Sequence, residues 1–323
     1  MVSKVNDLAL GIDIGGTNTA FGIVDRQGKV LQRGKIKTAG HVEIERFIDE
    51  LFLAALPLIE NAGGIGRIKG IGIGAPNGNY YNGTIELAPN LPWTGIIPLA
   101  EKVGEKFNLH TKLTNDANAA ALGEMIYGAA KEMKDFIMIT LGTGVGSGIV
   151  ANGKMVYGHD GFAGELGHTI IFPDGRYHPG TGSHGCLEMY CSASGLTKTA
   201  HEMLERKPDE STLLRQYLPD QIDSKIVYEC AMKNDVLAKE VYQYTGNVLG
   251  MALANFAMFS SPQAIILFGG LTKAGDLLML PTKKSFETNL LPLFRDKIQL
   301  IFSELFEGDA AILGASALVW DQG

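Results

Sequence analysis

The chain has 323 residues, of which 46% are hydrophobic and 20% charged, and its formal net charge at pH 7 is −7. This length allows two domains and a substantial core, and the composition is that of a soluble globular protein. The net negative charge argues against a nucleic acid or an anionic membrane as the main partner. The three cysteines, an odd number, give no disulfide framework, and the sequence contains neither a signal-peptide core nor a run of ~18 apolar residues. We therefore expect a cytoplasmic protein.

The first organised stretch, Leu8 to Val24, reads as a strand, a tight turn and a second strand. Its turn, Gly15-Gly16-Thr17, follows Asp13. We expect the glycines to adopt positive φ, so that successive N–H groups point into one concavity that suits phosphate oxygens. A carboxylate beside a phosphate repels it unless a divalent cation lies between them, so Asp13 indicates Mg²⁺ and a nucleotide. Taken alone, the stretch fits an ordinary hairpin better.

Apolar residues at helical spacing predict a helix over Val42 to Ala62, kinked or ended by Pro57. A glycine-rich strand then runs into the loop Gly74 to Asn77, and a short helix ends near Phe107. Residues 111–115 read as a strand. The alanine-rich segment from Asp116 onward predicts a helix directly after it.

The opening pattern then returns. Gly142-Thr143 follows a buried strand as Gly16-Thr17 does, and the spacing of 126 residues (142 − 16) also separates Gly148 from Gly22 (148 − 22). Identical spacing at two places indicates a duplicated unit. We therefore expect two similar α/β halves, each with a glycine turn after a strand, and two such turns facing across a cleft can hold a polyphosphate.

After the repeated turn, a loop-rich region is expected from Gly153 to Gly185. The apolar pattern then predicts further helices and two strands, the first of which runs into Gly269-Gly270. The expected helices span 186–207, 222–232, 235–259, 281–294 and 310–320, and the expected strands lie within 264–271 and 297–303.

Common phosphate-binding motifs do not explain the chain. The nearest approach to a P-loop, Gly148 to Met155, has methionine where Ser or Thr would hold Mg²⁺. The G-x-G-x-x-G run from Gly180 to Gly185 follows no buried strand, so it lacks the context of a dinucleotide site. Protein-kinase HRD and DFG signatures are absent from the sequence.

Asn115 and Asp116 lie at a predicted junction between a strand and a helix. An isolated Asp at this position most simply caps the helix. A carboxylate there can also accept the hydroxyl proton when a phosphoryl group is transferred to an alcohol. Asp116 is therefore the candidate general base, and Asn115 is a candidate hydroxyl-binding neighbour.

Glycine-rich segments carry two further acids and a histidine, Glu165, His168 and Glu188. Carboxylates accept hydrogen bonds from adjacent hydroxyls, so this set suits a polyol ligand. Each residue alone is explained as simply by a solvated acid or a structural histidine.

Taken together, IDIGGTNT, NDANAAALGE, ITLGTGVGSGIV, GFAGELGH, GCLE and IILFGG resemble the ROK sugar kinases, particularly bacterial glucokinases. The motifs follow the family order over essentially the whole chain. The resemblance implies an α/β, actin-like ATPase (ribonuclease H-like) fold with two α/β domains and a cleft between them. We expect a small domain, 1–115, joined by the C-terminal helix 308–323, and a large domain, 116–307.

The resemblance also implies ATP and Mg²⁺ as cofactors and a role for each motif. Asp13, Gly15, Gly16 and Thr17 would face the phosphates and metal from one side, Gly142, Thr143 and Gly144 from the other, and Gly269 and Gly270 would lie near the adenosine. Asn115, Asp116, Glu165, His168 and Glu188 would hold the sugar, with Asn90 and the loop 74–77 close by. Asp116 would be the base for the 6-hydroxyl. The family favours a homodimer.

The sequence departs from the family at one motif. Many members carry C-x-C-G-x-x-G-C, whose cysteines bind a structural zinc together with the histidine that matches His168. Here Pro179 and Thr181 replace two of these cysteines and only Cys186 remains. Because a structural zinc needs about four ligands, we predict no zinc of the usual kind, with His178 and His184 as a weak alternative set.

We expect an ATP-dependent hexose kinase, most simply a glucokinase, with a sugar and ATP as its small-molecule partners. Fructose, mannose, allose and N-acetylhexosamine remain alternative substrates, and a non-kinase actin-like ATPase remains an alternative class. Some relatives in this family are repressors with a DNA-binding domain before the first strand. About seven residues precede that strand here, so we expect no nucleic-acid partner, and also no membrane partner.

Overall fold

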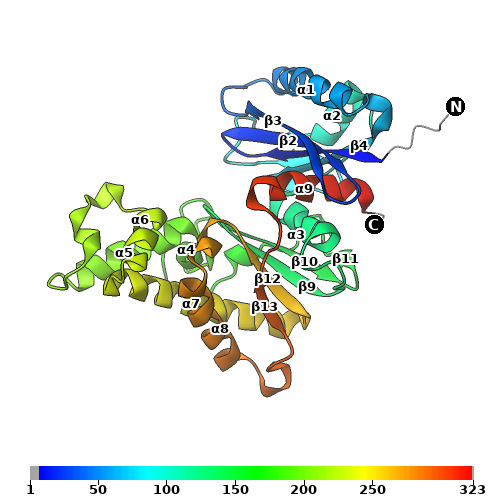
Figure 1. Ribbon diagram of the computed structural model, residues 1–323. Coiled ribbons are helices and arrows are strands. Elements are labelled where there is room, and N and C mark those ends of the chain that lie inside the picture. Colours follow the sequence, from blue (N-terminus) through cyan, green and yellow to red (C-terminus); the bar gives the residue numbers. More distant parts are fainter. Residues whose placement is uncertain (1–6, 322–323) are drawn as a thin grey trace. The chain divides into compact units, whose positions relative to one another are not determined.

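The computed structural model describes residues 7–321 as alternating strands and helices (Figure 1). Contacts between residues divide the chain into two compact units. Unit 1 contains the described residues up to Lys134, the segment Gly148–Gly164 and the described residues from Ser303 onward. Unit 2 contains Asp135–Ser147 and Glu165–Phe302.

A five-stranded sheet organises unit 1, in the order β3-β2-β1-β4-β8. Strand β1 pairs antiparallel with β2 and parallel with β4, which in turn pairs parallel with β8. The central strand β1 is an almost continuous apolar run because both of its faces are covered. The strands are β1 (Leu8–Ile14), β2 (Asn18–Asp25), β3 (Val30–Lys37), β4 (Ile68–Ala75) and β8 (Thr111–Asn115).

Helices cover both faces of this sheet (Figure 1). On one face lie α1 (Ile44–Asn61) and α2 (Leu99–Phe107), and on the other lies α9 (Glu307–Trp320), which packs against α3 (Asp116–Tyr127). Helix α1 continues through Pro57, so the prediction that this proline could end the helix is wrong. A small antiparallel sheet contains β5 (Gly78–Asn79), β6 (Thr84–Glu86) and β7 (Ile96–Ile97).

The second five-stranded sheet has the order β11-β10-β9-β12-β13. It repeats the first: two hairpin-linked strands, β9 and β10, are followed by β12 and β13, which pair in parallel beside β9. The duplication predicted from the 126-residue spacing is thus present in the strand order. The strands are β9 (Phe136–Leu141), β10 (Val145–Ala151), β11 (Lys154–Met155), β12 (Ala264–Phe268) and β13 (Gln299–Phe302).

The core of unit 2 is built around one long helix. Buried residues of α7, including Leu249 and Leu253, share a cluster with Ile139 of β9 and Leu267 of β12. The helices of this unit are α4 (Glu188–Cys191), α5 (Ala193–Arg206), α6 (Ser224–Met232), α7 (Val236–Ser260) and α8 (Asp276–Asn289). Short 3₁₀ turns span Ile65–Arg67, Leu166–His168, Leu213–Gln216, Pro219–Gln221, Gly270–Ala274 and Pro292–Phe294.

Two predicted helices differ in their bounds. The helix expected over 186–207 is interrupted at Ser192, whose extended backbone ends α4 and whose hydroxyl accepts the Gly195 N–H to begin α5. The helix expected to begin at Pro281 begins at Asp276 instead. Pro281 lies inside it, at the contact with Gly246, where a Cβ atom would come within 2.6 Å of the proline ring.

The C-terminal helix α9 packs on strands β1 and β4, as expected for a segment that returns to the first domain. Residues 322 and 323 of that expected helix lie outside the described residues. Helix α3, which we assigned to the large domain, groups by its contacts with unit 1 because it packs against α9. The division of the chain into functional domains stays a prediction.

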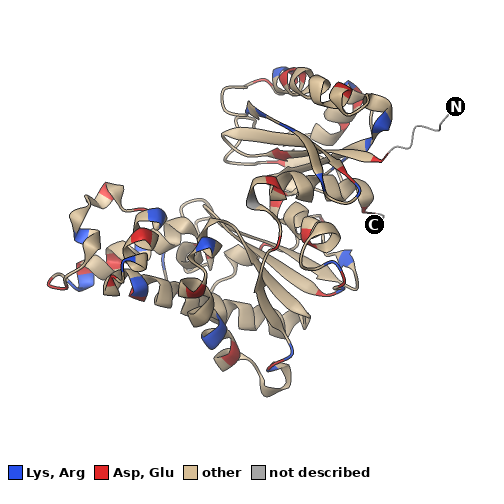
Figure 2. Cartoon of the chain, viewed as in Figure 1, with Lys and Arg blue, Asp and Glu red and all other residues tan. Residues whose placement is uncertain are grey.

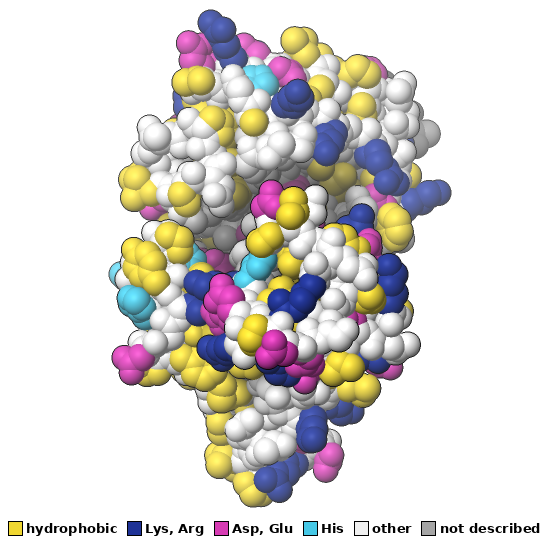
Figure 3. Space-filling model, turned by 90° about the vertical axis from the view of Figure 1, so that its left-hand side faces the viewer, with side chains coloured by type: hydrophobic (Ala, Val, Ile, Leu, Met, Phe, Trp, Pro, Cys, Tyr) yellow, Lys and Arg dark blue, Asp and Glu magenta, His cyan; other side chains and the backbone are white. Residues whose placement is uncertain are grey.

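Charged side chains of both signs are distributed over the helices, while the strands carry few (Figure 2). On the face drawn in Figure 3, acidic and basic side chains lie next to one another. Within residues 7–321, no helix has both the length and the apolar character required to cross a bilayer.

Candidate active site

Two acids of unit 1 lie at the same edge of its sheet. Asp13 near the end of β1 is opposite Gly74 of β4, and Asp116 directly follows β8. Because these three strands are parallel, their carboxyl ends meet. A Cβ atom at Gly74 would lie 3.8 Å from Asp13 Oδ1 and 3.6 Å from Asp116 Cα. Both acids therefore lie beside Gly74.

Both carboxyl groups have raised pKa values. Burial, together with the charge of Asp116, raises the pKa of Asp13 from 3.8 to about 7. Asp116 is exposed to solvent, yet the protein around its carboxyl group reduces hydration and raises its pKa. Two carboxylates that repel one another are an oxygen donor set that suits Mg²⁺. These residues therefore fit the predicted cation.

The first turn of α3 shows which residue caps the helix. Asn115 is the N-cap, and its Oδ1 accepts the Ala117 N–H at 2.8 Å. Asp116 is the first helical residue, and its Oδ1 accepts the same N–H at 2.8 Å. Since Asn115 already fills the capping position, capping alone does not account for Asp116.

The glycine turn after β1 forms for a different reason from the one we predicted. Gly15 and Gly16 do not have positive φ, so the conformational argument is wrong. Instead, a Cβ atom at Gly16 would lie 2.5 Å from the Asn90 carbonyl oxygen. Close approach of the segment that carries Asn90 therefore requires glycine here. The Thr17 carbonyl accepts the N–H groups of Thr38 and Ala39 at 3.0 and 3.2 Å.

The matching turn in unit 2 is also set by close approach. The Gly142 N–H donates to the Gly144 carbonyl at 3.0 Å, and neither glycine has positive φ. A Cβ atom at Gly144 would lie 2.4 Å from Glu188 Oε2. The turn therefore passes directly beside a predicted sugar-binding acid.

The predicted sugar-binding residues of unit 2 form one connected group. His168 Nε2 lies 3.9 Å from Glu165 Oε2, and the His168 and His178 rings meet edge to face at 5.4 Å. His178 Nε2 lies 2.8 Å from Glu188 Oε1. The Val145 N–H donates to Glu188 Oε2 at 2.8 Å. Unit 2 thus brings together Glu165, His168 and Glu188, and joins them through His178.

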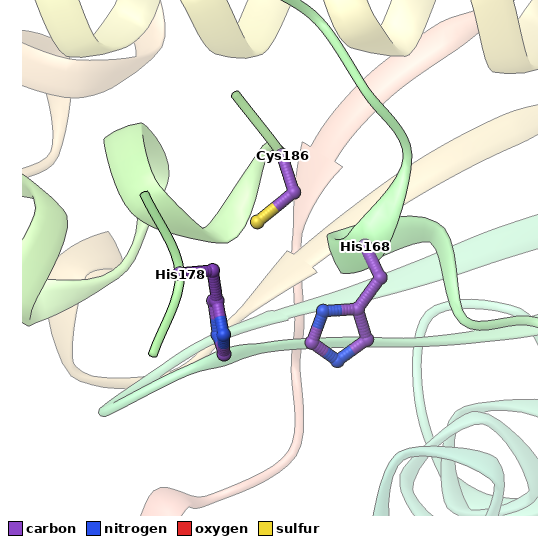
Figure 4. Close-up of side chains that lie close together, drawn as sticks. All are labelled: His168, His178 and Cys186. Carbon is purple, nitrogen blue, oxygen red and sulfur yellow. The ribbon is translucent and has the colours of Figure 1, made fainter. Parts of the chain in front are cut away.

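Three candidate metal ligands lie in or beside the loop in which Pro179 and Thr181 replace the family's cysteines. The ligand atoms of His168, His178 and Cys186 lie within 4.8 Å of one another, and the side chains point toward a common space (Figure 4). No fourth Cys, His, Asp or Glu of residues 7–321 joins this group. His184 points elsewhere, with Nδ1 3.1 Å from the Gly175 carbonyl oxygen. The absence of a usual zinc site stays a prediction.

A cavity of about 530 Å³ opens in unit 2 beside the second glycine turn. Gly142, Thr143 and Gly270, three of the residues that we expect at the nucleotide, line it, whereas Gly144 and Gly269 do not. Gly269 has φ +106°, and a Cβ atom there would lie 2.6 Å from the Leu141 carbonyl oxygen, so its role is to let two strand ends approach. The size and the mixed lining fit an adenosine group.

The sequence reasoning missed part of this cavity. Helix α6 supplies Ser224, Lys225, Tyr228 and Glu229, and the turn after β12 supplies Lys273. No motif marks α6, because its pattern is that of any amphipathic helix. The sequence reasoning considered His178 only as a possible zinc ligand. The one signal for a role near the sugar was its position in the same glycine-rich segment as Glu188.

The sequence model of the ROK family matches residues 9–322. The chain belongs to the ROK family. The glucokinase of Halalkalibacterium halodurans is 35% identical, with 97% of this chain and 95% of that protein covered.

Solved structures of the ROK family agree with the fold. The glucokinase from Streptomyces griseus, determined with glucose and AMPPNP, is 34% identical and has a TM-score of 0.80, with 96% of this chain and 98% of that chain covered. The predicted actin-like ATPase fold is thereby confirmed. The ROK family also includes regulators. A putative xylose repressor of Caldicellulosiruptor sp. is 28% identical, with 98% of this chain and 79% of that protein covered.

Proposed function

We propose that this ROK protein is an ATP- and Mg²⁺-dependent hexokinase that transfers the γ-phosphoryl group to the 6-hydroxyl of an aldohexose, most simply glucose. The observation that carries the proposal is Asp116, an acid with a raised pKa beside Asp13 at the carboxyl ends of three parallel strands. The similarity to glucokinases over nearly the full chain supports it.

In this mechanism Asp116 accepts the proton of the 6-hydroxyl as the oxygen attacks phosphorus. A raised pKa makes the carboxylate a better base near neutral pH, provided that it is ionised. The sugar hydroxyls are oriented by four side chains. Glu165 and Glu188 accept hydrogen bonds from them, while Asn115 and His168 can accept or donate. These contacts orient the attacking oxygen. Asn90 belongs to the same proposed group.

The nucleotide is assigned to the cavity lined by Gly142, Thr143 and Gly270 in unit 2. Asp13 would hold the cation, directly or through water, and Gly15, Gly16 and Thr17 would face the phosphates. Gly144 and Gly269 shape the neighbouring backbone. When bound, the cation neutralises charge on the phosphoryl group that is transferred.

Two alternatives make different predictions. A kinase for fructose, mannose, allose or an N-acetylhexosamine would use the same residues, because hydrogen-bonding acids do not by themselves identify stereocentres. An actin-like ATPase without a sugar substrate would hydrolyse ATP at a rate that no sugar changes. We therefore propose measuring ADP release with ATP and Mg²⁺ across a panel of sugars. Glucose-dependent release supports the proposal, and sugar-independent release contradicts it.

Substitution of the proposed base tests the mechanism. We expect Asp116→Asn to bind the sugar with near-normal affinity but to lose turnover by about 10²–10⁴-fold, because the amide cannot accept the proton. Calorimetric sugar titration and single-turnover kinetics would measure the two effects separately.

Asp49→Asn is the matched control for this experiment. Asp49 pairs with Lys106 on the surface, at a side chain that is 58% exposed, so its loss should leave both readouts unchanged. Wild-type turnover in Asp116→Asn would exclude Asp116 as the base.

A further inference from the structure

Glu188 is held at both of its carboxylate oxygens. Its Oε2 accepts the Val145 N–H at 2.8 Å, and its Oε1 lies 2.8 Å from His178 Nε2. The Glu188 side chain is 20% exposed, so it keeps access to a ligand while its orientation is restrained. A carboxylate with one partner per oxygen retains acceptor capacity for sugar hydroxyls.

The hydrogen bond at Nδ1 of His178 determines which ring nitrogen carries the proton. The Thr181 N–H lies 3.1 Å from His178 Nδ1. A backbone N–H can only donate, so Nδ1 is the acceptor and carries no proton. The proton of the neutral ring is therefore on Nε2, which donates it to Glu188. The loop thus selects the tautomer that the acid requires.

Backbone hydrogen bonds hold the loop that presents Thr181 to the ring. The His178 N–H donates to the Ser183 carbonyl, and the Gly182 N–H donates to the His178 carbonyl, both at 2.8 Å. The Thr181 and Ser183 hydroxyls are 2.7 Å apart. These contacts close the loop between His178 and Ser183. The loop contains Pro179 and Thr181, the two residues that replace cysteines.

We propose that His178 is a positioning residue for sugar binding: the closed loop fixes its tautomer, and its Nε2–H holds Glu188 in the orientation that the sugar hydroxyls require. The inference rests on the proposed function, in which Glu188 binds the sugar. It competes with a metal site at His168, His178 and Cys186. A metal on His178 would have to displace either Thr181 or Glu188 from the ring.

Two substitutions of His178 test its two hydrogen bonds, one at Nδ1 and one at Nε2, separately. Asparagine at 178 places an amide near Nδ1 and can keep the Thr181 contact, but it does not reach Glu188. Glutamine places its amide nitrogen near Nε2 and can still donate to Glu188. We expect His178→Asn to raise the KM for the sugar by about tenfold or more, with the KM for ATP unchanged, and His178→Gln to stay within about threefold of wild type.

His184→Asn is the matched control, because His184 lies in the same loop but contacts the Gly175 carbonyl rather than Glu188. An unchanged sugar KM in His178→Asn would overturn the proposal. So would equal impairment of the Asn and Gln variants. One equivalent of metal per chain, removed by a chelator with the same loss of sugar affinity, would assign His178 as a metal ligand instead.

A spectroscopic measurement on the wild-type protein covers the case in which His178→Asn does not fold. The proposal requires ¹⁵N shifts of His178 that show a proton on Nε2 and none on Nδ1, and a proton on Nδ1 would overturn it. Absence of turnover with every sugar would contradict the proposed function only. Calorimetric sugar titration of the variants and the ¹⁵N measurement would still test His178.

Discussion

Asp13 and Asp116 are two neighbouring acids whose ionisation the folded protein disfavours. Each carboxyl group is poorly hydrated, and the charge of Asp116 adds to the raised pKa of Asp13. Ionisation of both acids therefore costs folding free energy when no cation is present. In the proposed function, Asp13 holds the metal and Asp116 accepts the proton.

We expect Asp13→Asn to stabilise the metal-free protein at alkaline pH. The pKa of Asp13 is about 7 in the folded protein and 3.8 ordinarily, so the folded state binds the proton more tightly. This contribution to stability is present below pH 3.8 and is lost as the pH rises through 7. The variant should exceed wild type by about 2–4 kcal/mol at pH 8, and the difference should disappear toward pH 4.

Chemical denaturation in EDTA at several pH values would measure this difference. If the proposed function holds, phosphoryl transfer should be lost in the same variant, since it lacks the acid that we propose to hold the metal. Asp49→Asn provides the control for a surface acid. A stability difference that does not change with pH would contradict the assignment of the raised pKa to Asp13.

At the scale of elements, the close packing of α9 on the first sheet depends on glycines in β1 and β4. A Cβ atom at Gly11 would lie 2.2 Å from the Ile312 carbonyl oxygen, and one at Gly72 would lie 1.8 Å from that of Ala315. Both oxygens belong to helix backbone, which cannot rotate away as a side chain can. The returning helix therefore requires glycine at these strand positions.

We expect Gly72→Ala to lower the free energy of unfolding by about 3 kcal/mol, because the added methyl group forces α9 away from the sheet. Urea denaturation would measure the change. Lys35→Ala on the exposed side of β3 is the control and should have little effect. Stability equal to wild type would mean that α9 can move outward at no cost.

At the scale of the whole molecule, ligand binding and stability are linked. A ligand that binds only the folded chain stabilises it by ~2.7 kcal/mol when its free concentration is 100 times its dissociation constant. If the proposed function holds, the sugar that supports turnover should raise the melting temperature most.

Thermal denaturation with the same sugar panel would measure this effect without any chemical step. Asp116→Asn should retain the stabilisation, whereas Glu188→Ala should lose most of it, because in the proposed function Glu188 binds the sugar before any chemical step. Equal stabilisation by every sugar would contradict a specific hexose site.

The accuracy of the sequence predictions depended on how local each feature is. The family, the fold and the duplicated unit were predictable because motif order and spacing are properties of the chain itself. The break at Ser192 and the passage of α8 through Pro281 were not, since each depends on what packs against the helix. The glycine turns were recognised for a wrong reason, because a close approach involves a distant segment.

The sequence by itself determined the family, the presence of a duplicated unit, and the types of residue offered for phosphoryl transfer. Tertiary structure alone decided that Asp13 and Asp116 lie at one sheet edge with raised pKa values, and that α6 completes the cavity beside Gly142. It also places the Thr181 N–H beside His178 Nδ1, the contact from which we infer the tautomer of that ring. The reason is physical: charge coupling, dehydration and tautomer choice depend on distances between segments that are far apart in the chain.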